Sequence, residues 1–266
     1  GAGRLTRFTY AGLDTIVLHA DAGALIASDT VITPVDHPLD PGTLITPTPS
    51  GAWSGATLFE AGTTPAGNPA IRFDASGNAL AVYLQSGTVY ARRYEAGAWS
   101  APQSIKSSVV AAAELQFTLD AASGQALALW RQLDGVGVVG LWVNRYVPGQ
   151  GWTGATRVET SPTLIAGLQA TVDANGNALL VWHQLDGTLY NLHAKRYLNG
   201  VWQTAELIEN SSTSSITQTS LTSDGQGNHQ VLWRQSDGVG QSLYLNPYRA
   251  NPATAIPYYT VQSGDT

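Results

Sequence analysis

The sequence predicts an all-β fold, a β-propeller built from four-stranded antiparallel blades. Three observations carry this prediction: one pattern recurs four times, each copy divides into four strands joined by turns, and the composition suits a turn-rich β protein. Of the 266 residues, 43% are hydrophobic and only 12% are charged. This is enough apolar material for a sizeable core, with about half the usual share of charge.

Each copy centres on an acidic turn followed by an apolar strand that ends in an aromatic residue. In the third copy the turn is Asp173-Ala-Asn-Gly-Asn, and the apolar strand runs from Ala178 to Trp182. Copies spaced about fifty residues apart are typical of stacked repeat units. The turn glycines of the four copies are Gly77, Gly124, Gly176 and Gly227.

The third copy also shows how one unit divides into strands. Asp and Asn favour the first turn, Asp186-Gly187 is a strong hairpin signal, and Asn199-Gly200 turns the chain again. The second strand is apolar on both faces, so it must be covered on both sides, as in a propeller blade. The predicted strands are residues 168–173, 178–184, 189–197 and 201–209.

The tryptophans that open the fourth strands indicate how the propeller closes. Trp53 precedes the first complete unit, whereas the last unit, residues 217–249, has no such strand. Because an N-terminal strand commonly completes the last blade and removes exposed edges, we predict four blades closed by the Trp53 strand. The alternative is an open four-unit stack that pairs with another chain or with missing sequence. The other tryptophans of this series are Trp99, Trp152 and Trp202.

The predicted propeller, residues 53–250, is flanked by different segments. Residues 41–52 form a Pro/Thr linker after an N-terminal segment, residues 1–40. Gly3-Arg4-Leu5 and the later Tyr10 before Gly12-Leu13 resemble one unit of the YD (Rhs) repeat family, although Ala11 stands where that family has Asp. The resemblance implies a propeller module within a large bacterial protein.

Residues 251–266 are a second linker and a short C-terminal motif. The string Tyr-Thr-Val-Gln-Ser-Gly-Asp-Thr at residues 259–266 resembles the opening of a LysM domain, a family that binds N-acetylglucosamine polymers such as peptidoglycan. Eight residues cannot make that domain. The resemblance therefore implies neighbouring YD-repeat and LysM domains rather than a LysM activity.

Composition limits the partners and the compartment. A net charge of −6 and a pI of about 5.2 argue against nucleic acid, which requires clustered Lys and Arg. No apolar run is long enough to predict a membrane span. The absence of Cys excludes disulfides, and the absence of both Cys and Met favours an extracellular or bacterial cell-surface protein.

No motif assigns a catalytic residue, a cofactor or a metal. The string around Asp224 approaches the Asp-box of sialidases, but Trp233 is too far from the glycine. Glu114 stands outside the repeat pattern but has no identifiable partner for glycoside hydrolysis. His183 and His193 flank one hairpin without forming a ligand motif, and a calcium loop in the third copy lacks its final Glu. The recurring acidic residues Asp74, Asp120, Asp173 and Asp224 are interpreted as turn residues.

The exit of the second strand is the candidate ligand site. Propeller ligands often bind where strands two and three are joined, and aromatics with amides and carboxylates suit a sugar. The competing interpretation is that these residues cap hairpins while the tryptophans pack between blades. The candidate residues are Arg131, Gln132, Asp134, His183, Gln184, Asp186, Arg234, Gln235 and Asp237.

From these patterns we expect a non-catalytic interaction or scaffold module, not an enzyme, whose partner is a protein or a glycan. The alternative is a lectin-like carbohydrate-binding propeller. A second alternative is a sialidase-like glycosidase.

Overall fold

The computed structural model describes residues 55–60, 62–133, 137–161, 163–209 and 213–250. The predicted Trp53 strand, the segment 1–40, the linker 41–52 and residues 251–266 lie outside these ranges. The chain divides into two units, residues 1–57 and 58–266, and the sheets described below belong to the second. The described residues form no helix of the length and apolarity that a membrane crossing needs.

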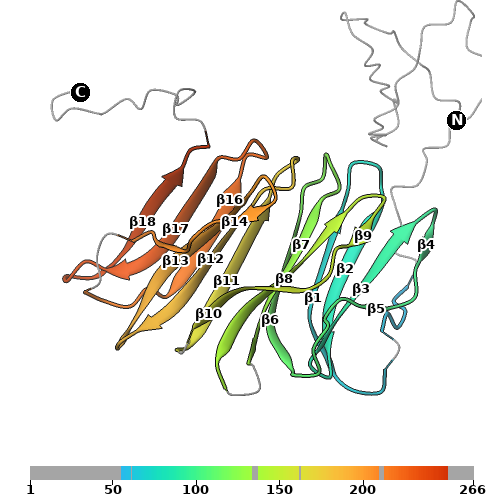
Figure 1. Ribbon diagram of the computed structural model, residues 1–266, viewed down its shortest axis with the longest axis horizontal. Helices are drawn as coiled ribbons and strands as arrows, with labels where there is room; N and C mark the ends of the chain where they lie inside the picture. The colour runs from blue at the N-terminus through green and yellow to red at the C-terminus, as the bar shows by residue number, and fades with distance from the viewer. Residues whose placement is uncertain (1–54, 61, 134–136, 162, 210–212, 251–266) are drawn as a thin grey trace, which may run out of the picture. The chain divides into compact units, whose positions relative to one another are not determined.

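The described residues form four antiparallel sheets, which confirms the all-β propeller fold (Figure 1). The first sheet has the order β1-β2-β3-β4, with β5 also pairing with β3. Its strands are β1 (Ala66–Phe73), β2 (Ala79–Gln85), β3 (Thr88–Glu95), β4 (Ala98–Trp99) and β5 (Gln103–Ser104). The second sheet has the order β10-β8-β7-β6, with β9 pairing with β8. Its strands are β6 (Ala112–Leu119), β7 (Ala126–Leu133), β8 (Val139–Val147), β9 (Gly151–Trp152) and β10 (Thr156–Ser161).

The third sheet repeats this plan, and the fourth is shorter. The third has the order β11-β12-β13-β14, with β15 pairing with β13, and the fourth has the order β16-β17-β18. The strands of the third are β11 (Ile165–Val172), β12 (Ala178–Asp186), β13 (Leu189–Leu198), β14 (Val201–Trp202) and β15 (Glu206–Leu207). Those of the fourth are β16 (Gln218–Ser223), β17 (His229–Ser236) and β18 (Gln241–Tyr248). The fourth sheet has no outer strand among the described residues.

The sheets lie side by side in chain order, and the core fills the spaces between neighbouring sheets (Figure 1). The second strand of each sheet is the best buried, as its apolar sequence predicts. Trp130 of β7 and Trp182 of β12 are fully enclosed, each in the cluster between its sheet and the preceding one. Burying such a side chain stabilises the fold by about 1.5–3 kcal/mol, so the tryptophans hold successive sheets together.

The first strand of three sheets contains a β-bulge. The register shifts between Gly67 and Ala70 in β1, and at the same place in β6 and β11. A residue with positive φ lies at each bulge: Asn68 at 49°, Glu114 at 52° and Gly167 at 63°. Gly and Asn tolerate this conformation, whereas Glu adopts it at a cost. The side-chain contacts of Glu114 with Arg131 and with the Leu168 N–H offset this cost.

Candidate functional site

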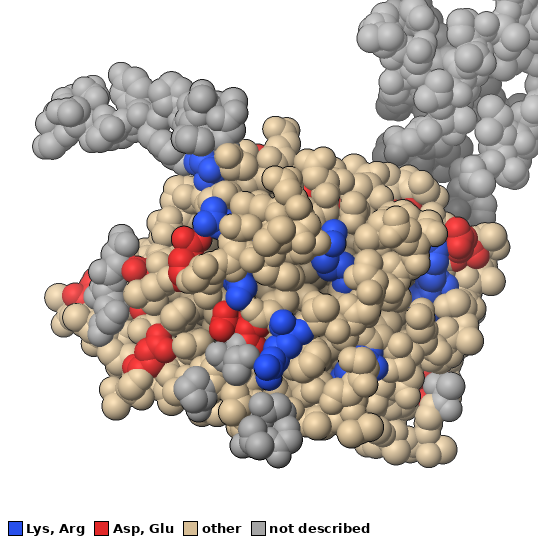
Figure 2. Space-filling view, viewed as in Figure 1, with Lys and Arg blue, Asp and Glu red and all other residues tan. Residues whose placement is uncertain are grey.

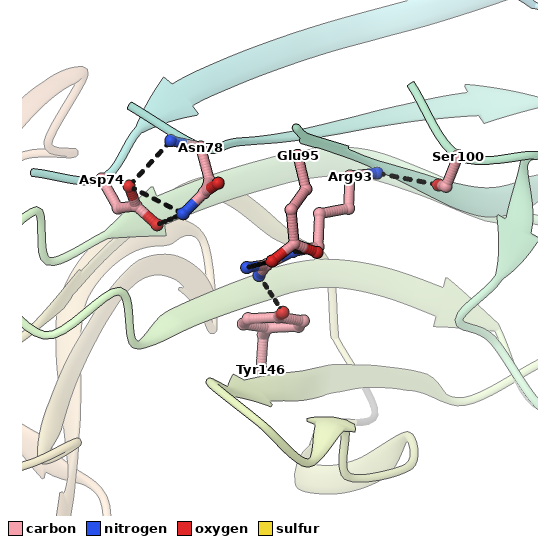
Figure 3. Close-up of polar contacts among 6 residues, drawn as sticks. All are labelled: Asp74, Asn78, Arg93, Glu95, Ser100 and Tyr146. Carbon is pink, nitrogen blue, oxygen red and sulfur yellow. Dashed lines mark hydrogen bonds and ion pairs between the residues drawn. The ribbon is translucent and has the colours of Figure 1, made fainter. Parts of the chain in front are cut away.

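The aspartates of the acidic turns accept hydrogen bonds from N–H groups of their own turns. Asp74 Oδ1 accepts the N–H groups of Ser76 and Asn78 at 2.9 Å each, and its carboxylate also accepts the Asn78 side-chain amide (Figure 3). Asp173 and Asp224 repeat this arrangement with Asn177 and Asn228. These carboxylates satisfy backbone donors that the turn would otherwise leave unpaired, which agrees with their interpretation as turn residues.

The glutamines at the exit of the second strand are bonded within the fold, and two of the predicted three are buried. Gln132 and Gln235 are 4% and 1% exposed. The indole N–H of Trp233 donates to Gln235 Oε1 at 3.2 Å, and Gln235 Nε2 donates to the Ser214 carbonyl at 2.8 Å. Trp130–Gln132 and Trp182–Gln184 repeat the indole contact at 3.5 and 3.3 Å.

The charged residues of the predicted ligand site, Arg131 and Asp237, bond within their own sheet or to the next sheet. Arg131 pairs with Glu114 at 3.2 Å and donates to the Ile165 carbonyl of β11. Asp237 caps its own hairpin, and its hydrogen bonds from Ser242 and from Gly240 lower its pKa to about 2. Arg234 is half-buried, and Asp134 lies outside the described residues.

Asp186 is the centre of a small polar network. It accepts hydrogen bonds from Gln184 at 3.0 Å and from Asn191 at 3.2 Å, and its carboxylate lies 2.7 Å from His193 Nε2. Burial opposes its ionisation, but these bonds outweigh burial and hold the pKa of Asp186 below its ordinary value. The structure thus joins Gln184 and Asp186, two of the predicted residues, in one site.

The two histidines of this hairpin do not approach each other. His193 stacks on Trp182, whereas His183 lies on the opposite face of β12 and contacts Thr219 Oγ1 at 2.7 Å. Burial lowers the pKa of His183. No group of three or more His, Asp or Glu side chains within the described ranges is arranged to hold a metal ion.

A polar hollow of about 340 Å³ lies between the first strands of all four sheets. Apolar residues form only part of its wall. The polar side chains that line it are Arg72, Gln116, Thr118, Asp120, Gln169, Thr171, Thr222 and Ser223. Because every sheet contributes, the hollow lies where the inner strands of the propeller meet.

Gln116 and Gln169 are the distinctive residues of this hollow. They occupy the same position in β6 and β11, four residues before the turn aspartates Asp120 and Asp173. Neither amide has a hydrogen-bond partner among the described residues, in contrast to the bonded glutamines at the strand exits. The sequence interpretation missed them. Aligning the four copies on the turn would have marked them, because the same position holds Ala70 and Ser220 in the other copies.

The face shown in Figure 2 is mostly uncharged, with Lys and Arg scattered among Asp and Glu rather than gathered in one patch. The hollow follows this character, since one guanidinium and one carboxylate stand among amides and hydroxyls. Such a lining offers both donors and acceptors to a neutral polar ligand.

No protein-family model matches the chain, and no curated protein matches it in sequence. Solved structures do match. An α-L-arabinanase from Penicillium chrysogenum has 10% identity and a TM-score of 0.48, over 68% of this chain and 62% of that one. The catalytic domain of a GH62 α-L-arabinofuranosidase from Coprinopsis cinerea has 14% identity and a TM-score of 0.41, over 69% and 73%. A protein of unknown function from Dyadobacter fermentans has 12% identity and a TM-score of 0.47, over 72% and 67%.

These matches correct one expectation. The prediction of a non-catalytic interaction or scaffold module that is not an enzyme is wrong, because the two matched proteins of named activity given above are glycosidases. At such low identity, and with TM-scores below 0.5, these matches carry no substrate over to this chain, and the arabinose-containing substrates in those names belong to those proteins.

Proposed function

We propose that this chain is a carbohydrate-active protein that binds a neutral glycan in the polar hollow between the inner strands. The observation that carries the proposal is a pair of amides without a hydrogen-bond partner in the described part of the chain, Gln116 and Gln169, at equivalent positions of adjacent sheets. A carboxamide offers two donors and an acceptor in one plane, which suits the vicinal hydroxyls of a sugar. The volume of about 340 Å³ lies at the lower end of the range for small-molecule sites.

The chemistry of the remaining lining supports the same ligand class. Thr118 and Thr222 add hydroxyls from two further positions, and Arg72 bonds within the described residues to the carbonyl of its neighbour Ile71. A strongly acidic or basic ligand finds no matching cluster there. An extracellular or cell-surface setting, predicted from the absence of Cys and Met, is part of this proposal.

Bond cleavage is a separate question from binding. Glycoside hydrolysis generally uses two carboxyl groups about 5–9.5 Å apart. Glu114 and Asp120 stand at opposite ends of β6, and six residues of strand span about 20 Å. These two carboxylates are therefore not such a pair, so we test hydrolysis directly.

Binding is tested by calorimetry of the purified chain against a panel of neutral oligosaccharides and acidic ones. The double variant Gln116→Ala/Gln169→Ala should weaken binding of the neutral ligand at least about tenfold, equivalent to about 1.4 kcal/mol. The matched control is Arg234→Ala at a strand exit, which should bind as the unchanged chain does. Release of reducing ends from the bound glycan reports hydrolysis in the same samples.

Two outcomes would overturn the proposal. The first is the absence of binding across the panel. The second is binding that Arg234→Ala abolishes and the glutamine variants leave intact, which would place the ligand at the strand exit predicted from the sequence.

A further inference from the structure

The last sheet exposes a face that is buried in the others. Leu243 of β18 is 70% exposed, whereas Val89, Leu141 and Leu192 at the same position of the other sheets are fully buried. Leu232 and Leu245 on the same face are 39% and 56% exposed. An apolar face of this kind on a stacking sheet is one half of an interface.

The first sheet exposes the complementary half. A pocket of about 730 Å³ beside β1 and β2 is lined by Phe59, Ile71, Ala81 and Tyr83, and also by Leu115, Gln116 and Phe117 of the second sheet. Ile71 is 47% exposed. The hydroxyl of Tyr83 is buried and has no hydrogen-bond partner among the described residues. In the other three sheets, the tryptophan at this position is buried and its indole N–H is bonded.

The chain contains one outer-strand sequence for each sheet. In the first three sheets, the outer-strand tryptophan is followed six residues later by an apolar residue that contacts the next sheet. These pairs are Trp99/Ile105, Trp152/Val158 and Trp202/Ile208. Trp53/Phe59 has the same spacing, although Trp53 itself lies outside the described residues. The chain therefore has four outer-strand sequences for four sheets. Three of them pair within the first three sheets, so the sequence that contains Phe59 remains as the outer strand of the fourth sheet.

Phe59 already makes half of the contacts that this position requires. Ile208 N–H donates to Leu192 O of its own sheet at 3.0 Å, and Ile208 O accepts Asn246 Nδ2 of the next sheet at 2.8 Å. Ile105 does the same with Val89 and Asn144, at 3.0 and 2.8 Å. Phe59 O accepts Arg92 of the first sheet, but its N–H makes no backbone bond among the described residues.

The residues after Phe59 confirm this equivalence. Gln85 Nε2 donates to Glu60 Oε2 at 2.9 Å and to the Thr64 carbonyl at 2.9 Å. Gln235 Nε2 donates to Glu209 Oε2 at 3.3 Å and to the Ser214 carbonyl at 2.8 Å. Leu58–Glu60 is therefore equivalent to Leu207–Glu209, the end of an outer strand.

We propose that Leu58–Phe59 pairs with the free edge of β18 in the same chain and closes the four sheets into a ring. Phe59 N–H then donates to Leu243 O, and Leu58 lies opposite Tyr244, as Leu207 lies opposite His193 and Ser104 lies opposite Tyr90. The leucine face of β16–β18 covers Ile71 and the pocket beside Tyr83. This closure pairs the free edge of β18 and buries the leucine face of the fourth sheet at the same time.

A disulfide trap tests the register directly, because the chain has no cysteine. In Leu58→Cys/Tyr244→Cys, directly opposed residues bring Cα atoms to about 4.5–5.5 Å, within disulfide range. Mild oxidation should give a monomer with an internal disulfide and no free thiol. The matched control, Leu58→Cys/Leu245→Cys, is shifted by one residue and should stay reduced. A disulfide-linked dimer, which identifies a second copy as the occupant, or free thiols in the test pair would overturn the proposal.

Hydrogen exchange on the unaltered chain gives a second measurement that no substitution can disturb. The amide of Phe59 should exchange as slowly as those of Ile105 and Ile208, whose backbone bonds are present. Exchange of the Phe59 amide at the rate of an unprotected peptide group would contradict closure.

Discussion

The guanidinium of Arg145 lies over the ring of Tyr197 in the next sheet, with Cζ 4.2 Å from the ring centroid and Nη1 2.7 Å from the hydroxyl oxygen. Arg93 and Tyr146 form the same pair between the first two sheets (Figure 3), and Arg196 and Tyr248 form it between the last two. The series ends where Pro247 holds the arginine position. Any seam beyond the fourth sheet must therefore rely on other contacts.

Replacing Arg145 with Ala should lower the free energy of unfolding by about 1–2 kcal/mol, because the cation–π contact and the hydrogen bonds to the Tyr197 hydroxyl and the Gly176 carbonyl are lost. Tyr197→Phe keeps the ring and loses only the hydrogen bond from Arg145, so it should lower the free energy of unfolding by about 0.5–1.5 kcal/mol. Urea denaturation of the two variants measures both values. A variant Arg145→Ala as stable as the unchanged chain would show that the pair contributes nothing to sheet stacking.

Gly167 and Gly187 form a matched pair of positive-φ glycines. An added Cβ at Gly187, where φ is 67°, meets nothing within 4 Å, whereas at Gly167, with φ 63°, it lies 2.7 Å from the ring of His183. Gly187→Ala should cost about 1 kcal/mol from backbone strain alone. Gly167→Ala should cost at least about 1 kcal/mol more, since His183 must move from Thr219. Equal losses in thermal unfolding would argue against this clash.

Two variants of Glu114 separate its side chain from its backbone strain. Both Glu114→Gly and Glu114→Ala remove the ion pair with Arg131 and the bond from Leu168 N–H. Only Gly relieves the positive φ of 52°. The glycine variant should therefore be the more stable of the two by about 1 kcal/mol in urea. The opposite order would mean that the bulge relaxes when the side chain is removed.

The repeat allowed the sheets to be predicted well, because turn residues and apolar strands are local signals. The predicted strand 178–184 became β12 (Ala178–Asp186), and the predicted strand 189–197 became β13 (Leu189–Leu198). The predicted fourth strand, 201–209, is instead two short strands, β14 and β15, each pairing with β13. Gln203 N–H donates to Arg196 O at 2.8 Å just after β14, and the chain pairs with β13 again only at Glu206 and Leu207, a break that the sequence pattern does not show.

The site was harder to predict because burial decides which polar residues are free. Gln132 and Gln116 have the same chemistry, and only the tertiary structure shows that Gln132 is buried beside Trp130 while Gln116 faces the hollow. The β-bulges were equally hidden. Glu114 is an ordinary strand residue in sequence, and its left-handed backbone follows from contacts with Arg131 and Leu168.

Glu209 should make stability depend on pH. It is 6% exposed, and burial raises its pKa to about 7 despite the hydrogen bond from Gln235. Between its unfolded pKa of 4.5 and its folded value, the folded chain keeps a proton that the unfolded chain has released, so this group loses stability as pH rises. Burial lowers the pKa of His183 and of His229, which lose stability in the opposite direction, as pH falls below about 6.5. Both chains contain His183 and His229, so their contributions cancel when the stability of Glu209→Gln is compared with that of the unchanged chain at each pH.

The stability of Glu209→Gln relative to the unchanged chain should therefore rise by about 1–3 kcal/mol between about pH 5 and about pH 8. Urea denaturation across that range measures the difference. Parallel curves for Glu209→Gln and the unchanged chain would show that the carboxylate at position 209 ionises in the folded protein as it does in the unfolded one.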